Sequence, residues 1–253
     1  ADWYVKNTKD ILLNVPIPIS TGGSNDPIRN AGKIRNQGIE FNLGWNESLN
    51  KDLSYGVTFL GTYNKNEVIE MGAESQAITG GTIHGGTYTS RTLAGYPIGG
   101  FWLIPTDGYF NSTEEVQAYQ KDGVLIQPSA EPGDIRFKDT NNDGTINDED
   151  RVYCGSPFPK FTYSINGNLT YKNVDFSVGF QGVAGNKIYN ATKLELTDVT
   201  RGTNYLASTL DYWTPENQDA ANPRLIWTDP NRNARSGDRH LNCVSEKNKA
   251  ITL

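Results

Sequence analysis

The feature that most constrains this chain is a pair of strictly alternating segments past its midpoint. From Phe161 to Tyr171, apolar residues and glycine occupy the odd positions, and threonine, serine and asparagine occupy the even ones. The alternation resumes at Val174, after a Lys172-Asn173 corner, and continues to Phe180. Because a period of two gives a strand one apolar and one polar face, the pattern predicts a β-hairpin formed by residues 161–171 and 174–183.

Further strands are predicted where weaker versions of this pattern occur. Their ranges are residues 2–13, 38–46, 54–64, 87–93 and 98–104. The strands at 38–46 and 54–64 form a second hairpin through a short polar link, and those at 87–93 and 98–104 turn at Gly95-Tyr96-Pro97. A short helix is expected from 112 to 120, because Ser112 and Glu115 have the spacing of a capping box.

Composition agrees with an all-β chain. The 253 residues include 26 glycines and 13 tyrosines but one methionine, a balance that favours strands, turns and polar loops over helices. A net charge of -6 without clustered Lys and Arg argues against nucleic acid as a partner. No apolar run reaches the roughly 18 residues of a transmembrane helix, but a transmembrane strand needs only about ten alternating residues. With no signal peptide at Ala1, the chain is expected to be an internal piece of a longer protein.

The connections differ in length in a systematic way. Within the clearest hairpins the links are short, whereas residues 14–33, 105–160 and 184–240 are predicted to form long loops. Short turns on one rim and long loops on the other are typical of outer-membrane barrels. Aromatic residues lie on the apolar face near both ends of the strands, as the two girdles of a barrel would: Trp45, Tyr55 and Tyr171 near the short turns, and Tyr63, Phe161 and Tyr163 near the long loops. Alternation alone does not separate such a barrel from a soluble β-sandwich whose apolar face packs on a second sheet.

An acidic segment before the central hairpin matches the template of a calcium loop. Oxygen-bearing residues recur at the ligand positions, Gly144 stands at the sixth position, where the chain must turn, and Ile146 is an apolar anchor at the eighth. The candidate ligands are Asp139, Asn141, Asp143, the Thr145 carbonyl, Asn147 and Asp150. Asp in place of Glu at the last position predicts weaker affinity, and the flanks do not read as the paired helices of an EF-hand. The alternative is an Asx-rich turn without an ion.

No catalytic constellation is present in the sequence. It contains no G-x-S-x-G, H-E-x-x-H or phosphate-loop motif, and its two histidines, His84 and His240, lack a second ligand at metal-site spacing. Cys154 and Cys243 are far apart and belong to no metal-binding pattern, so a disulfide is neither implied nor excluded. We therefore expect no enzymatic activity.

Several collinear motifs resemble the barrel of SusC/RagA-type TonB-dependent outer-membrane transporters. The central one runs from Pro132-Gly133-Asp134-Ile135 through the acidic loop to Pro159-Lys160-Phe161. The others, in order, are Thr8 to Leu12, Asn30 to Glu40, Tyr63 to Asn66, Gly95 to Gly99, Gln181 to Gly185 and Trp213 to Asn217. The resemblance covers nearly the whole chain up to Arg239; residues 240–249 depart from the family pattern, and only Lys247-Asn248 and Ile251-Thr252-Leu253 match the strand expected there.

The resemblance implies that the chain is the later part of a barrel of about 22 strands. The plug, which connects such transporters to the TonB complex, and the N-terminal domains would lie upstream. Members import oligosaccharides or peptides with a SusD-like surface lipoprotein as a lid over extracellular loops. The apolar strand faces would then contact outer-membrane lipid. The alternative from another class is a secreted, calcium-dependent β-sandwich that binds carbohydrate.

Overall fold

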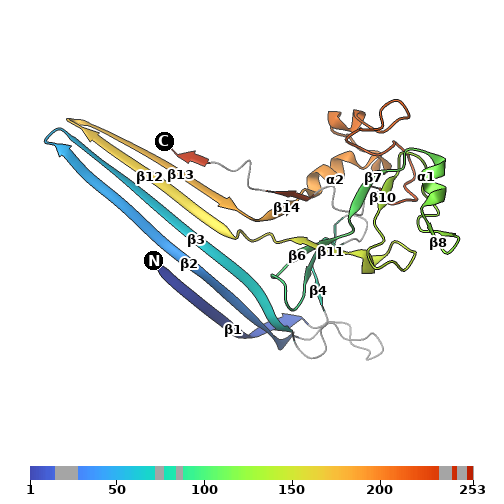
Figure 1. Ribbon diagram of the computed structural model, residues 1–253, viewed down its shortest axis with the longest axis horizontal. Helices are drawn as coiled ribbons and strands as arrows, with labels where there is room; N and C mark the ends of the chain where they lie inside the picture. Colours follow the sequence, from blue (N-terminus) through green and yellow to red (C-terminus); the bar gives the residue numbers. More distant parts are fainter. Residues whose placement is uncertain (15–27, 72–76, 84–87, 234–240, 244–249, 253) are drawn as a thin grey trace.

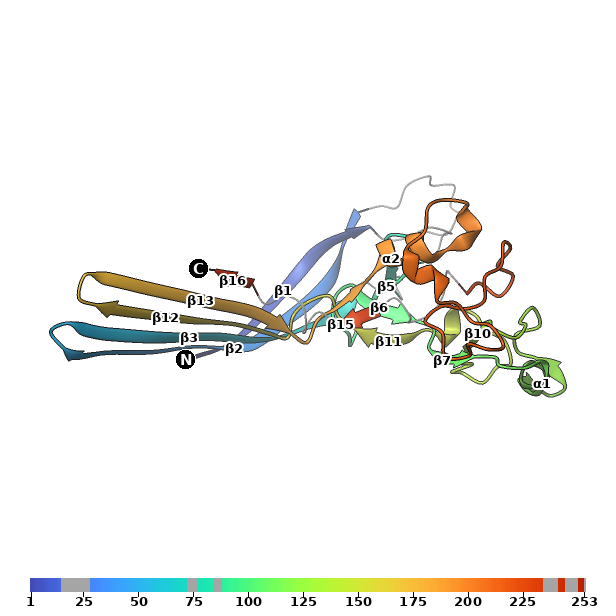
Figure 2. The ribbon, with the colours of Figure 1, turned by 90° about the horizontal axis from the view of Figure 1, so that it is seen from above.

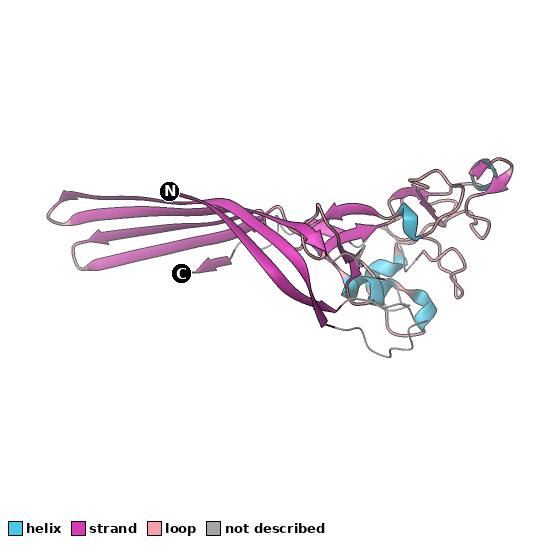
Figure 3. Ribbon diagram, turned by 90° about the horizontal axis from the view of Figure 1, so that it is seen from below, coloured by secondary structure: helices cyan, strands magenta, loops and turns pink. Residues whose placement is uncertain are grey.

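The fold is taken from a computed structural model, which describes residues 1–14, 28–71, 77–83, 88–233, 241–243 and 250–252. Long antiparallel strands form a sheet at one end, and short strands and helices form a second part at the other (Figures 1 and 3). We call this second part the lobe; it consists of the described residues of 77–159, 185–233 and 241–243. Among the described residues, no helix is both long enough and apolar enough to cross a bilayer.

The large sheet has six strands in the order β1-β2-β3-β12-β13-β16. Their bounds are Asp2–Asn14 for β1, Ile28–Asn50 for β2, Leu53–Met71 for β3, Phe161–Tyr171 for β12, Val174–Ala184 for β13 and Ala250–Thr252 for β16. All neighbours pair antiparallel, and β12 pairs with β3 and β13 without a register shift. Lys172 adopts a positive φ of 53° in the tight turn between β12 and β13. The antiparallel sheet expected from the alternation is therefore present.

Two strands extend well beyond their predicted ranges. β2 was expected from 38 to 46 and runs from Ile28 to Asn50, and β3 was expected from 54 to 64 and runs to Met71. Residues 28–33, assigned to a long loop by the sequence, are thus part of β2, while 15–27 lie outside the described residues. The added stretches contain apolar residues such as Ile34, Val68 and Ile69 but without a strict period of two, so alternation did not reveal them.

The lobe is a folded unit and not a set of plain loops. One sheet has the order β11-β6-β5-β4, and three further pairs are β10-β7, β8-β9 and β14-β15. The bounds are β4 Ile78–Thr79, β5 Ser90–Thr92, β6 Gly100–Leu103, β7 Thr106–Tyr109, β8 Gln120–Lys121, β9 Val124–Leu125, β10 Ile135–Phe137, β11 Val152–Gly155, β14 Lys187–Tyr189 and β15 Leu241–Cys243. β5 and β6 form the hairpin predicted at 87–93 and 98–104 with shorter strands, and position 87 lies outside the described residues.

Helices occur only in the lobe among the described residues (Figure 3). They are α1 (Thr113–Ala118), α2 (Ala191–Thr197) and the short 3-10 helices η2 (Asp148–Asp150), η3 (Val199–Arg201) and η4 (Ala207–Leu210). The predicted capping of α1 is confirmed, because the Ser112 hydroxyl accepts a hydrogen bond from the Glu115 N–H at 3.3 Å. The stretches 105–160 and 184–240, expected to be long loops, therefore contain helices and strands, with 234–240 outside the described residues.

The buried apolar core lies mainly in the lobe. One cluster consists of Ile104, Ile135 and Phe137, and another of Phe110, Val116 and Ala130. The Tyr119 ring packs on the second cluster, and its hydroxyl donates to the Phe137 carbonyl of the first at 2.7 Å. The long strands of the large sheet extend away from the lobe (Figure 2), and many of their large apolar side chains are exposed.

Candidate functional site

The first functional surface is the apolar face of the large sheet. The pairing places Leu43 beside Phe59 and Phe59 beside Ile165, and the row continues to Phe180 on β13. Directly paired residues of antiparallel strands share a face, so the odd positions of β2, β3 and β12 form one continuous surface with the even positions of β13. Its large side chains are exposed, with 63% of Trp45 and 54% of Phe176 accessible. Such an exposed surface requires an apolar environment.

The opposite face of the same strands is polar and nearly neutral. Three successive rows across the sheet consist of amide, hydroxyl and glycine residues, with one leucine. They are Asn42-Leu60-Ser164-Gln181, Gly44-Thr58-Asn166-Gly179 and Asn46-Gly56-Asn168-Ser177. In the two rows that flank these three, carboxylates occur at Glu40, which pairs with Asp2 of β1, and at Asp175. An apolar outside and a polar inside is the arrangement of a transmembrane barrel wall.

The second site is the acidic loop, which the structure resolves as a series of side-chain to backbone turns. Asp139 accepts hydrogen bonds from the backbone N–H groups of Asp143 (3.1 Å) and Gly144 (2.8 Å). Gly144 has a φ of +92°, so the sharp turn predicted at the sixth position is present. Ile146, the predicted apolar anchor, packs against the core cluster of Ile104 and Ile135. The sharp turn at Gly144 and the apolar anchor at Ile146 were therefore predicted correctly from the sequence.

Asp143 is the most strongly perturbed carboxylate of the loop. The Asn141 amide donates to it at 3.0 Å, and the backbone N–H and hydroxyl of Thr145 donate to its other oxygen at 2.8 and 2.9 Å. The Asn141 contact contributes most, followed by Thr145, and together with Asn147 these donors lower the pKa of Asp143 from 3.8 to about 2. The carboxylate is thus ionised at neutral pH.

Asp150 ends the loop as a buried acceptor. Its side chain is fully buried, and its two oxygens accept from the backbone N–H groups of Thr140 (2.7 Å) and Asn147 (2.8 Å). Asn147 in turn caps η2, accepting from the Glu149 N–H at 2.6 Å. No group of three or more His, Cys, Asp or Glu side chains suited to hold a metal is found among the described residues. The six candidate ligands lie along one loop, and calcium binding there stays a prediction.

Arg151 connects this loop to the four-stranded sheet β11-β6-β5-β4 of the lobe. Its guanidinium pairs with Asp148 at 2.8 Å and donates to the carbonyls of Tyr88 and Trp102, both at 3.1 Å. It also lies 4.5 Å from the centre of the Tyr88 ring, within the range of a cation–π interaction. The loop is therefore anchored to β6 and not freely suspended.

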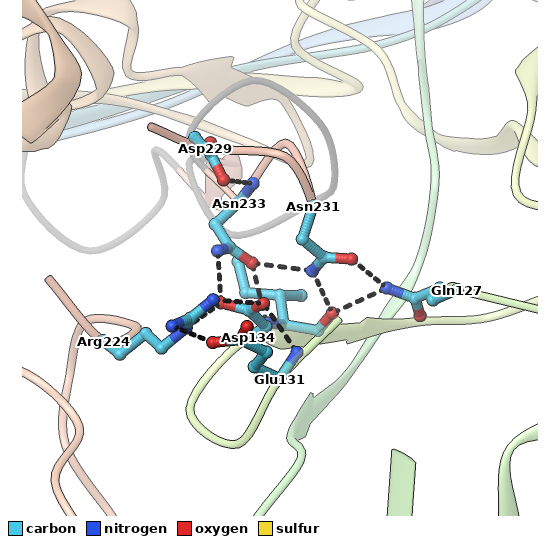
Figure 4. A network of polar contacts seen from close by, with 8 residues as sticks. Gln127, Glu131, Asp134, Arg224, Asp229, Asn231 and Asn233 are labelled. Atoms are coloured by element: carbon cyan, nitrogen blue, oxygen red, sulfur yellow. Dashed lines mark hydrogen bonds and ion pairs between the residues drawn. The ribbon is translucent and has the colours of Figure 1, made fainter. Parts of the chain in front are cut away.

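A third site is a buried polar network centred on Asp134 (Figure 4). The Arg224 guanidinium donates to both Asp134 oxygens, at 2.7 and 3.1 Å, and to Glu131 at 2.6 Å. Burial by itself would lower the pKa of Arg224, but the hydrogen bonds and charges of Asp134 and Glu131 outweigh it and raise that pKa. The charge pair is thus strongly favoured in its ionised form.

Asparagine and glutamine side chains extend the network. The Asn233 amide donates to Asp134 at 2.8 Å and accepts from the Ile135 N–H at 2.8 Å. The Gln127 amide donates to Asn231 (2.8 Å) and accepts from the Phe137 N–H (2.9 Å). It therefore connects Asn231 to strand β10. The contacts of Gln127 with Asn231 and of Asn233 with Asp134 join residues about a hundred positions apart in the sequence.

Sequence reasoning missed this network, although it singled out two of the motifs that meet there. Gly133 has a φ of +90°, and a Cβ at this position would lie 2.5 Å from the Trp213 ring, so the Pro132-Gly133-Asp134 and Trp213-Thr214-Pro215 motifs pack together. The residues missed were Gln127, Arg224, Asn231 and Asn233. The available signal was a dense run of polar residues at Asp229-Pro230-Asn231-Arg232-Asn233, which lacks any periodicity.

The two-faced sheet and the lobe at one end of it define a piece of an antiparallel transmembrane β-barrel. No family model matches the sequence. The TonB-dependent receptor P26 of Formosa agariphila is 32% identical over 226 residues, which are 88% of this chain and 22% of that receptor. SusC of Bacteroides thetaiotaomicron is 26% identical over 194 residues, which are 74% of this chain and 18% of SusC.

Solved structures agree with these relatives in fold. The RagAB peptide transporter superposes with a TM-score of 0.67 at 18% identity, covering 94% of this chain and 24% of that chain. The chain is a homologue of SusC/RagA-type TonB-dependent transporters, as the collinear motifs predicted. It spans about a fifth of the length of the curated relatives it matches.

Proposed function

We propose that this chain is part of the barrel of an outer-membrane TonB-dependent transporter, which imports oligosaccharides or peptides together with a SusD-like surface lipoprotein. The observation that carries the proposal is the large sheet, with an exposed apolar face and a neutral polar face in continuous register. β12 has 11 residues, and a tilted strand of about 9–11 residues crosses the hydrocarbon core of a bilayer.

The rival function, a secreted calcium-dependent β-sandwich, requires a second sheet over the apolar face. Within the described residues, the other sheets have two to four short strands, and Trp45 and Phe176 remain exposed. This arrangement favours lipid over a second sheet as the environment of the apolar face.

Membrane fractionation of cells that express the complete protein tests the proposal. We expect the protein in the outer membrane, extracted only by detergent, with the gel mobility of the folded barrel changing on heating. Recovery of the protein as a soluble monomer without detergent would contradict the proposal.

The imported substrate belongs to the same proposal. One solved relative is described as a peptide transporter, whereas the neutral amide and hydroxyl rows of this chain suit hydroxyl-rich solutes as well as peptide backbones. Growth of a strain lacking the complete gene, on peptide mixtures and on oligosaccharides as sole nutrients, separates the two classes. If the strain grows normally on both nutrients, the import role is contradicted.

Energy coupling and partners are inferred in the same way. The TonB complex would act through a plug domain outside this chain, and the lipoprotein would cover the lobe. Two exposed side chains in the lobe support a protein partner there, Leu210 at 77% and Trp227 at 73% accessible. We also infer that the acidic loop binds Ca²⁺ through Asp139, Asn141, Asp143, Thr145, Asn147 and Asp150, which is supported by the match of its turn and anchor to the calcium-loop template.

A further inference from the structure

A cavity of about 250 Å³ lies where the large sheet meets the lobe. One wall is formed by residues 63–67 of β3, another by the turn at 95–97, and the third by residues between Tyr153 and Lys160. The Asn64 N–H donates to the Lys160 carbonyl at 2.9 Å, and the Val68 N–H donates to the Tyr96 carbonyl at 2.9 Å. The cavity therefore occupies a gap along the β3 edge, between its pairing with the start of β12 and its pairing with the turn.

The cavity lies at the end of the apolar face that is nearest the lobe. Tyr63 pairs with both Ile39 and Phe161, so its ring belongs to the last aromatic row of that face. Phe158, on the third wall, is also an exposed large apolar side chain. Lys65 follows Tyr63 on the same face by strand alternation, so the surface changes from aromatic to charged at the cavity. In a barrel wall this change marks the boundary between hydrocarbon and water.

The polar groups of the cavity favour an anion. Two lysines, Lys65 and Lys160, and one acidic residue, Glu67, are among the residues that line it, which gives the lining a net positive charge; a Glu67 oxygen lies 2.7 Å from Lys65 Nζ. Tyr96 and Tyr153 lie 5.1 Å apart between ring centres, and both line the cavity. Burial, with a smaller contribution from Tyr96, raises the pKa of Tyr153, so its hydroxyl keeps its proton at neutral pH.

We propose that this cavity binds the phosphate-bearing head group of a membrane lipid, with the acyl chains lying along the apolar face beside Tyr63. The inference rests on the proposed function, because the apolar face must contact a bilayer. A basic pocket at the membrane boundary is a recurrent site for anionic lipid head groups. Aromatic residues at the same depth fix the interface.

Lipid binding to the complete transporter, purified in detergent and measured by native mass spectrometry, tests the inference. The probes are phosphatidylglycerol, zwitterionic phosphatidylcholine and, as a competitor without acyl chains, inorganic phosphate. We expect K65Q/K160Q to weaken phosphatidylglycerol binding at least about fivefold, the effect of one basic group near an anionic lipid. E67Q removes the competing carboxylate and should strengthen that binding, which keeps the test valid if the double variant fails to fold.

The matched control is K51Q/K172Q, which removes two lysines from the short turns at the other end of the strands, away from the cavity. Its phosphatidylglycerol binding should equal that of the unchanged protein. Equal binding of both lipids, no response to K65Q/K160Q and E67Q, or complete displacement by millimolar phosphate would overturn the lipid site. Any of these results would reject the lipid site without affecting the proposed function, because the protein would still require detergent. A protein that is soluble without detergent would refute the proposed function itself.

Discussion

Asp134 is the centre of the buried polar network of the lobe. It is fully buried, and its oxygens receive Arg224, Asn233 and the Glu131 N–H. Asp134→Ala leaves the partly buried Arg224 without its main counter-charge, so we expect a loss of at least about 2 kcal/mol in the free energy of unfolding. Hydrogen exchange of residues 127–137 in the complete protein measures it.

Asp107 supplies the matched control for this prediction. It pairs with Arg136 at 2.9 Å and Lys138 at 3.6 Å, but all three side chains are substantially exposed. Asp107→Ala should change stability by less than about 1 kcal/mol, as exposed pairs do. Equal exchange rates in the two variants would contradict the assigned role of Asp134.

Asp143 gives the acidic loop a specific pH dependence. Because its pKa is lowered to about 2 in the folded state, its hydrogen bonds stabilise the loop fully above the unfolded value near 4, and this contribution is lost as the pH falls through about 2. An NMR titration of the Thr145 amide should therefore show a midpoint near 2. A midpoint near 4 would show that Asn141 and Thr145 do not hold the carboxylate in solution.

Calcium binding by the same loop makes a separate prediction. If Asp139, Asp143 and Asp150 share an ion, chelation of calcium should lower the melting temperature and expose the loop to protease, and added calcium should restore both. Asp139→Asn should weaken this response, since it removes one charged ligand. No response to chelation would leave the alternative, a turn held by its own hydrogen bonds.

At the scale of a strand, the two faces of β2 predict opposite tolerance to charge. Leu43 lies on the apolar face in the row of Phe59 and Ile165, whereas the adjacent Asn42 lies on the polar face in the row of Leu60 and Ser164. Leu43→Arg should cost about 2–4 kcal/mol near the bilayer midplane, and Asn42→Arg much less. The folded fraction of the complete barrel, read from its heat-dependent gel mobility, compares the variants. Equal loss in both would mean that lipid does not contact the apolar face.

The same elements explain what sequence could predict. β12 was placed from 161 to 171, as observed, because alternation is strict and the Lys172-Asn173 turn bounds it. The extension of β2 from Ile28 to Gln37 went unnoticed, because outside an apolar environment a strand needs no alternation. In the lobe, the β5–β6 hairpin was predictable, but the other strands have two to four residues, too few to show a period, and the core joins residues from distant segments such as Ile104 and Ile135.

The acidic loop and the Asp134 network show the same limit at a site. Gly144 and Ile146 were predictable, because the calcium-loop template fixes both positions within twelve consecutive residues. The partners of Asp134 were not, because Arg224 and Asn233 lie about ninety to a hundred residues away and only the fold brings them together. A site formed within one short segment can be predicted from a single sequence, whereas a site formed by distant segments cannot.

At the scale of the whole molecule, the Asp134 network joins the two halves of the lobe. Residues 127–137 precede the β12–β13 hairpin and residues 224–233 follow it, so the network fixes both connections over the same end of the sheet (Figures 1 and 4). The segment that carries Arg224 also carries Trp227, and a Cβ at Gly202 would lie 3.5 Å from the Trp227 ring. An exposed aromatic side chain on such a braced segment is suited to a protein interface, because little order is lost on binding.

The last prediction therefore concerns the lipoprotein partner. Trp227→Ala combined with Leu210→Ala should weaken its binding to the complete transporter by about thirtyfold, the loss expected for an aromatic side chain central to an interface. Val124→Ala, which truncates another exposed apolar residue of the lobe, is the control and should bind normally. Affinity is measured with the purified pair in detergent. If the double variant binds like the unchanged protein, the partner does not contact the lobe at Trp227 and Leu210.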